Sequence, residues 1–205
     1  MIALARGLLA ETAATRSGGW QVGVGEALAG KTFGVIGLGH LGTRVARVAQ
    51  AFEMRVLAWS ENLEAQTARS VDIEPVSKTE LLTSSDVVSV HLVLSERTKG
   101  LIGADELRLM RSSAYLINTS RAQIIDTKAL LDALYAGTIA GAGIDVYDEE
   151  PLPSDHPLRS APNTVLTPHI GYVTADAYRS WFDDVIADIK AWIAGSPTRV
   201  LAPSV

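Results

Sequence analysis

Three polar side chains have the types and positions from which a sheet-and-helix protein could build an active site: Arg121, Glu150 and His169. A guanidinium can bind a carboxylate through two parallel hydrogen bonds. A carboxylate beside an imidazole favours the protonated ring, which can then donate a proton near neutral pH. Position alone leaves other interpretations open, namely a surface arginine, a packed loop histidine and a solvated acidic loop. The spacing does not show that Glu150 reaches His169.

The most informative local motif is the glycine-rich segment 35–42, with the sequence VIGLGHLG. It directly follows an apolar run and opens a helical pattern. In this GxGxxG arrangement Gly37 permits a tight turn, Gly39 lets a pyrophosphate approach the backbone, and Gly42 lets helix and strand pack closely. The strand, the helix and the next strand all stand where a dinucleotide fold requires them. This context favours dinucleotide binding over a merely structural turn.

The end of the second predicted strand bears on the choice of coenzyme. Dinucleotide folds that bind NAD place an acidic residue there, about 20 residues after the glycines, against the ribose hydroxyls. Here the position holds Ser60, Glu61 comes one residue later, and no arginine stands beside them to bind a 2′-phosphate. We therefore favour NAD as the coenzyme without excluding NADP. In the alternative interpretation, Ser60 simply caps the following helix.

Short β-rich runs alternate with segments of helical periodicity, which is the pattern of a parallel sheet covered by helices on both faces. Cap signals mark two of the helices: Ser77 with Glu80 begins one, and Asp126 begins another that stops at Gly137. The expected fold class is α/β, a Rossmann-like doubly wound parallel sheet of six or seven strands with flanking helices. The apolar runs that predict strands lie at 32–36, 55–59, 87–92, 114–118, 140–145 and 164–166, with a weaker one near 71–73.

We expect the whole chain, 1–205, to form a single dinucleotide-binding domain. Within it the sequence predicts a leading helix over 1–17, a Rossmann core over 18–172, and a C-terminal helix with a tail over 173–205. The last helix runs from a Thr174 cap to Gly195, and its wide apolar stripe must be buried somewhere. The residues of that stripe fall at three- and four-residue steps: Tyr178, Trp181, Phe182, Val185, Ile186, Ile189, Trp192 and Ile193.

The composition argues against several classes of function. The 205 residues carry 18 Lys and Arg against 23 Asp and Glu, a net charge of −5, which leaves no basic surface for nucleic acid. No apolar run approaches the about 20 residues that a bilayer needs, and Arg6 interrupts the apolar start before the hydrophobic region of a signal peptide can form. With no cysteine and four scattered histidines, we expect neither disulfides nor a metal site. We therefore expect a soluble, cytoplasmic protein.

Several separated motifs together resemble the D-isomer-specific 2-hydroxyacid dehydrogenase family, specifically its NAD-binding domain and the flanks of that domain. They cover nearly the whole chain, and their order and spacing are much more specific than the glycine motif alone. The motifs are GLGHLG at 37–42, SDVVSVHL at 85–92, NTSR at 118–121, GIDVYDEEP at 143–151 and TPHIG at 167–171.

The resemblance implies acid-assisted hydride transfer between an NAD-type coenzyme and a small 2-keto or 2-hydroxy acid. Arg121 would bind the carboxylate and carbonyl of the substrate, His169 would protonate the carbonyl oxygen, and Glu150 would pair with the imidazole. Asp145 would take the carboxamide of the coenzyme. The coenzyme contacts that the resemblance implies are His40 and Leu41 at the pyrophosphate, Ser60 at the ribose, His91, Leu92 and Thr98 on the adenosine side, and Thr119, Asp145 and Gly171 at the nicotinamide.

The chain also departs from the family pattern. Ser60 takes the usual acidic place, Val93 stands where proline is common, and Ala122 stands where glycine is common. From the resemblance we expect that most of the family's N-terminal substrate domain lies outside this chain, as in a truncated protein, a reading frame begun at an internal Met or a natural minimal protein. Two function classes stay open: a 2-hydroxyacid oxidoreductase, and a non-catalytic module or inactive fragment that binds NAD(H). We expect a homodimer, in which the leading helix takes part and the stripe around Trp181 packs on the core or on the partner.

Overall fold

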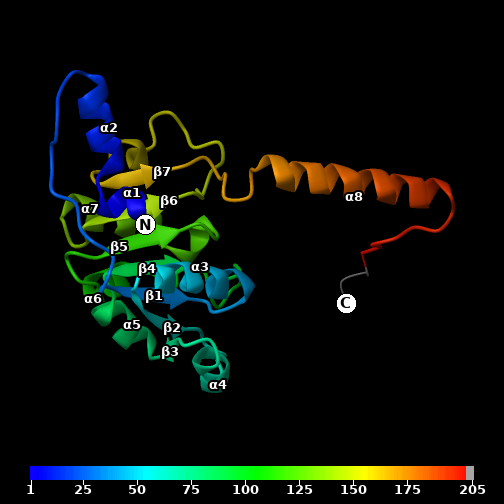
Figure 1. Cartoon of the computed structure of the whole chain (residues 1–205), viewed down its shortest axis with the longest axis horizontal. Coiled ribbons are helices and arrows are strands. Elements are labelled where there is room, and N and C mark those ends of the chain that lie inside the picture. The colour runs from blue at the N-terminus through cyan, green and yellow to red at the C-terminus, as the bar shows by residue number, and fades with distance from the viewer. Residues whose placement is uncertain (202–205) are drawn as a thin grey trace. The chain divides into compact units, whose positions relative to one another are not determined.

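The structure is a computed structural model that describes residues 1–201. The chain forms two compact units, Met1–His169 and the segment from Ile170 onward. In the first unit seven strands form one parallel sheet in the order β3-β2-β1-β4-β5-β6-β7 (Figure 1). The strands are β1 (Thr32–Ile36), β2 (Arg55–Trp59), β3 (Glu74–Pro75), β4 (Val87–Val90), β5 (Tyr115–Asn118), β6 (Gly141–Ile144) and β7 (Thr164–Leu166).

The strand order confirms the predicted Rossmann-like fold. Strands are added outward on one side from β1 to β3, and the chain then returns to place β4 on the other side of β1. Open α/β sheets bind their ligands outside the carboxyl ends of the strands at such a reversal. The crossing between β1 and β4 therefore marks where a coenzyme would lie.

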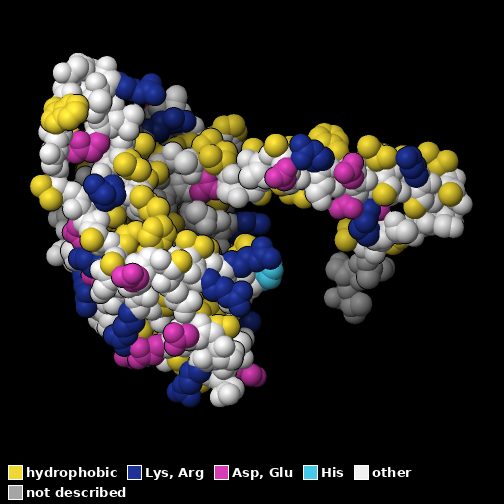
Figure 2. Space-filling view, in the orientation of Figure 1, with side chains coloured by type: hydrophobic (Ala, Val, Ile, Leu, Met, Phe, Trp, Pro, Cys, Tyr) yellow, Lys and Arg dark blue, Asp and Glu magenta, His cyan; other side chains and the backbone are white. Residues whose placement is uncertain are grey.

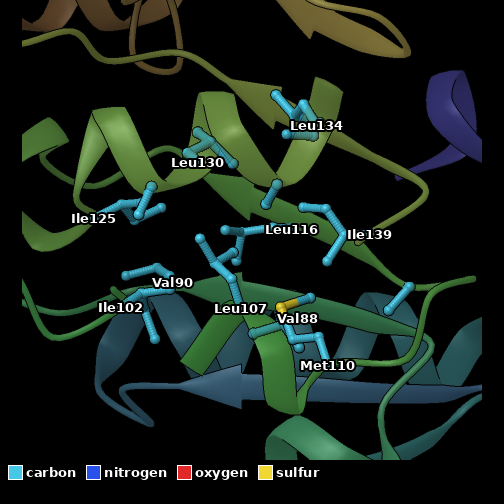
Figure 3. Packing of buried hydrophobic residues seen from close by; sticks show 14 of the residues in the cluster. Val88, Val90, Ile102, Leu107, Met110, Leu116, Ile125, Leu130, Leu134 and Ile139 are labelled. Carbon is cyan, nitrogen blue, oxygen red and sulfur yellow. The ribbon is translucent and has the colours of Figure 1, made fainter. Parts of the chain in front are cut away.

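Helices cover both faces of this sheet, and two apolar clusters form the core. One cluster joins β4, β5 and β6 to the helices of one face, and Figure 3 shows Leu107 close to Val88 and Val90, with Leu116 and Leu130 in the same packed group. The other cluster joins β1 and β2 to the opposite helices. The helices of the first face are α5 (Lys78–Ser84), α6 (Ala104–Leu109) and α7 (Thr127–Tyr135), and those of the second are α3 (His40–Ala51) and α4 (Ala65–Arg69); short turns of 3-10 helix lie at Ala122–Ile124 and Pro157–Ser160.

Most predicted strands are confirmed, with ends that move by one or two residues. The strand predicted near 71–73 is wrong, because the edge strand β3 is formed by Glu74–Pro75 instead. Ile73 is buried in the second cluster, but it lies in a turn in which Asp72 has a φ of 57°. Its apolar character therefore reflects packing beneath α4 and not pairing in the sheet.

The leading segment forms two helices where the sequence predicted one. The break falls at Gly7, whose φ of 57° lies in the left-handed region, between α1 (Ile2–Ala5) and α2 (Leu8–Arg16). Leu4 is buried and packs beside β6, whereas α2 has no buried residue. The leading segment thus belongs to the first unit through α1.

The second unit contains one long helix, α8 (Ala175–Ile193). As predicted, Thr174 caps it, its hydroxyl accepting a hydrogen bond from the Ala177 amide at 3.2 Å, and a left-handed Gly195 follows its end. Within this unit the apolar stripe of α8 is uncovered, and Figure 2 shows hydrophobic side chains along the helix surface; what covers the stripe stays a prediction. Among the described residues, no helix combines the length and the apolar character needed to cross a membrane.

Candidate active site

The candidate residues of the first unit lie at one edge of the sheet. Gly37 directly follows β1, Ser60 follows β2, His91 follows β4, Thr119 follows β5 and Asp145 follows β6. Because all strands are parallel, their carboxyl ends lie along the same edge. The topology therefore gathers residues that are far apart in the sequence.

The glycine turn has the close packing that a dinucleotide site requires. Gly37 has a φ of 100°, and a Cβ on it would lie 2.7 Å from the carbonyl oxygen of His91. A Cβ on Gly42 would lie 2.1 Å from the carbonyl oxygen of Gly37, so α3 can approach β1 only with glycine there. At Gly39, by contrast, a Cβ would meet nothing within 4 Å. The side of the turn at Gly39 is thus open for a ligand to approach the backbone.

A cleft of about 690 Å³ opens beside this turn. It passes between the loops that follow β2 and β4, so it has the position and size for the adenosine end of a dinucleotide. No side chain caps the first turn of α3, which leaves its amide groups directed at the glycine turn. These residues fit an NAD-type coenzyme. The cleft is lined by Gly37, Leu38, Gly39, Ser60, Glu61, Asn62, Leu63, Glu64, Thr67, His91, Leu92, Val93, Ser95, Arg97 and Thr98.

The predicted coenzyme residues divide into those in the cleft and those outside it. Ser60 lines the cleft and does not cap the next helix, since α4 begins after Glu64. The alternative interpretation of Ser60 as a helix cap is therefore wrong. His40 and Leu41 form the start of α3, beside the cleft. Gly171 lies in the second unit.

The imidazole of His91 adds no charge to the cleft near neutral pH. Burial lowers the pKa of His91 to about 4, so the ring is neutral. Its Nε2 lies 2.9 Å from the hydroxyl of Ser89, inside the sheet. The charged side chains that line the cleft are then Glu61, Glu64 and Arg97.

A buried asparagine shapes the loop that carries Arg121. Asn118 is 1% exposed, and its side chain accepts a hydrogen bond from the Ser120 amide at 3.0 Å and donates one to the Arg121 carbonyl at 2.9 Å. The Ser120 hydroxyl donates to the Leu92 carbonyl at 3.0 Å, which ties this loop to the one after β4. The guanidinium of Arg121 is exposed and donates to the Ser120 carbonyl at 2.7 Å, so the structure holds it within its own loop.

Glu150 and His169 are brought together, as predicted from the resemblance. Glu150 Oε2 lies 2.8 Å from His169 Nδ1, and Glu150 Oε1 accepts a hydrogen bond from the Tyr147 amide at 2.9 Å. The bond to His169 and then the bond from Tyr147 lower the pKa of the Glu150 carboxyl, so it is ionised near neutral pH. An ionised carboxylate only accepts hydrogen bonds, so Nδ1 carries the hydrogen and Nε2 is the ring atom that can exchange a proton.

Tyr147 connects the two loops that carry this pair. Its hydroxyl lies 2.9 Å from the Thr167 carbonyl and 3.2 Å from the Ile144 carbonyl. The Thr167 hydroxyl in turn donates to the Asp145 carboxylate at 2.5 Å. Just beyond, His169 adopts a φ of 56°, a left-handed conformation that is rare outside glycine and concentrated at functional sites. Asn118, Tyr147 and Thr167 hold these loops and are not among the predicted site residues, although each lies inside one of the sequence motifs.

Comparison with known proteins identifies the family. Residues 1–171 match the model of the D-isomer specific 2-hydroxyacid dehydrogenase, NAD binding domain. The chain belongs to this family. The predicted family membership is therefore confirmed, and with it the prediction of an NAD-binding domain.

Individual members of the dehydrogenase family match over most of this chain. A glyoxylate reductase from Aeropyrum pernix is 42% identical over 160 residues, which is 77% of this chain and 48% of that protein. The structure of a glyoxylate reductase from Paecilomyes thermophila matches with a TM-score of 0.85 at 34% identity, over 99% of this chain and 62% of that one. A D-lactate dehydrogenase with NAD+ from Lactobacillus jensenii gives a TM-score of 0.82 at 27% identity, over 99% of this chain and 66% of that one. The chain thus spans about half the length of the first of these relatives.

Proposed function

We propose that this chain forms the nucleotide-binding part of an NAD-dependent oxidoreductase that interconverts a small 2-keto acid and its 2-hydroxy acid. The observation that carries the proposal is the 2.8 Å contact between Glu150 and His169 at the carboxyl edge of the sheet. Among relatives, a glyoxylate reductase and a glycerate dehydrogenase point to short 2-keto acids such as glyoxylate and hydroxypyruvate as substrates.

His169 is the proton donor in this proposal. NAD(H), when bound, supplies or takes the hydride. The protonated imidazole donates from Nε2 to the carbonyl oxygen as negative charge develops there, and Glu150 stabilises the ring while it is charged. In the reverse direction the neutral ring accepts the proton of the hydroxyl group. Arg121 binds the substrate carboxylate by leaving the Ser120 carbonyl, and a guanidinium suits that role because it can form two parallel hydrogen bonds.

Replacing His169 tests the proposal. We expect His169→Gln to lower the turnover of NADH with glyoxylate or hydroxypyruvate by about 10²–10⁴-fold, the usual contribution of a general acid. The dissociation constant of NADH should stay unchanged. The matched control is His156→Gln, because His156 accepts a hydrogen bond from the Leu158 amide outside the candidate site.

Two outcomes of this experiment would count against the proposal. Equal turnover of wild type and His169→Gln would remove His169 as the acid. Saturable NADH binding by wild type, with no turnover of any short 2-keto acid, would favour the non-catalytic binding module. Loss of turnover in His156→Gln as well would show that the assay reports folding and not proton transfer.

The assembly and location of the protein are part of the same proposal. We propose a homodimer, supported by the exposed Leu8 and Leu9 on α2 and by the exposed Trp181, Phe182 and Ile186 on α8. We also propose a cytoplasmic location, because the chain has no cysteine for an oxidising compartment to cross-link. Sedimentation of the wild-type protein tests the first point, and a monomer at micromolar concentration would contradict it.

A further inference from the structure

An ion pair spans the cleft beside the glycine turn. Glu61 follows β2, and Arg97 lies in the loop after β4, so the two residues come from opposite walls. Arg97 Nη1 lies 3.8 Å from Glu61 Oε2, and their side chains are 68% and 64% exposed. An ion pair this exposed contributes little to stability. The pair therefore adds little to folding, although while it is formed the Glu61 carboxylate occupies the Arg97 guanidinium.

The place of this pair in the fold bears on coenzyme choice. In dinucleotide folds the end of β2 meets the adenosine ribose, where an acidic residue favours the free 2′-hydroxyl of NAD and an arginine favours the 2′-phosphate of NADP. In this chain Ser60 directly follows β2 and contributes no charge. Charge comes instead from Glu61, the next residue, and from Arg97 across the cleft, which the sequence alone could not place there. The fold therefore brings both kinds of selecting group to one position.

We propose that Glu61 and Arg97 select the coenzyme: the Glu61 carboxylate disfavours a 2′-phosphate and holds the guanidinium that would otherwise bind it. The lining of the cleft carries two carboxylates, Glu61 and Glu64, against the single guanidinium of Arg97. This excess of negative charge makes NAD(H) the preferred coenzyme of the wild type. Arg97 is then a latent phosphate-binding residue that the loss of Glu61 would release. This inference rests on coenzyme binding in the proposed function.

The test is equilibrium binding of NADH and of NADPH to the full chain, followed by fluorescence. Wild type should bind NADH more tightly than NADPH. In Glu61→Gln the ratio of the two affinities should move toward NADPH by about tenfold, because a repulsive charge is removed and an attractive one is released. In Glu61→Gln combined with Arg97→Gln most of that gain should disappear, since the released guanidinium is its main source.

Two control variants separate this mechanism from a general effect of charge. Glu64→Gln removes the other carboxylate of the cleft and should move the ratio by about twofold, as expected of a screened charge alone. Glu74→Gln removes a carboxylate paired with Arg55, at the opposite end of β2, and should leave the ratio unchanged.

Three results would overturn the inference. In the first, Glu61→Gln and Glu64→Gln shift the ratio equally. In the second, the double variant keeps the whole gain of Glu61→Gln. In the third, wild type already prefers NADPH. Binding of neither coenzyme by any variant would overturn the proposed function, and the inference with it, whereas binding without the predicted coupling would overturn the inference alone.

Discussion

Replacing Gly42 by alanine should destabilise the fold at the point where α3 meets β1. The new Cβ would lie 2.1 Å from the carbonyl oxygen of Gly37 and 3.2 Å from Cγ1 of Val35, and the first of these is a backbone atom that cannot rotate away. Overpacking costs about 1–3 kcal/mol, and so close a backbone contact belongs at the upper end of that range. Alanine gains about 1 kcal/mol over glycine within a helix. The net loss should be about 2 kcal/mol.

The assay for this prediction is thermal or urea unfolding of the purified chain. For a protein of this length, about 2 kcal/mol lowers the Tm by roughly 4–8 °C. The matched control is Gly39→Ala, where the added Cβ meets nothing within 4 Å and the backbone is extended. That variant should unfold within about 1 kcal/mol of wild type, the difference between glycine and alanine at a helix cap, and should bind NADH more weakly. An unchanged Tm in Gly42→Ala, or an equal loss in Gly39→Ala, would refute the packing argument.

Two further predictions concern positioning and pH. Because burial lowers the pKa of His91 to about 4, the ring costs the fold no stability above pH 6.5, the pKa of the unfolded residue. As the pH falls from 6.5 toward 4, the unfolded chain binds a proton that the folded chain does not, so about 3 kcal/mol of stability should be lost. Urea unfolding at several pH values should show this slope in wild type and a weaker one in His91→Gln; parallel slopes would contradict it. Tyr147→Phe removes the hydroxyl shared by the Thr167 and Ile144 carbonyls, which should cost about 1–2 kcal/mol. It should also lower turnover more than NADH affinity, and a variant with wild-type stability and turnover would exclude Tyr147 as a positioning residue.

The sheet could be predicted because most strands are continuous apolar runs. A strand buried on both faces is apolar at nearly every position, so it is recognised as a continuous apolar run. Val87–Val90 is such a strand, since all four of its residues are buried. The edge strand β3 could not be placed in this way, since it has two residues, one of them proline, and pairs on one side only. The neighbouring apolar residue Ile73 gave the stronger local signal, although it packs from a turn.

From the sequence we could predict only those site residues whose roles depend on their neighbours along the chain. The roles of Gly37 and Gly42 follow from one turn, so their spacing carries the information. The pairing of Glu150 with His169 joins residues 19 positions apart, and only the family resemblance suggested it. The approach of Arg97 to Glu61 depends on two loops that the sheet order makes neighbours, and no motif contains both. Contacts of this kind follow from topology and not from spacing.

A titration of the wild-type chain with NADH that follows energy transfer from tryptophan to the nicotinamide tests whether the cleft beside the glycine turn binds the coenzyme. Trp59 ends β2 and directly precedes Ser60 in the wall of the cleft, so a bound coenzyme should lie near it. We expect saturable binding at one site per chain, with a smaller transfer signal and the same dissociation constant in Trp59→Phe. A signal that rises linearly with NADH and never saturates would contradict it.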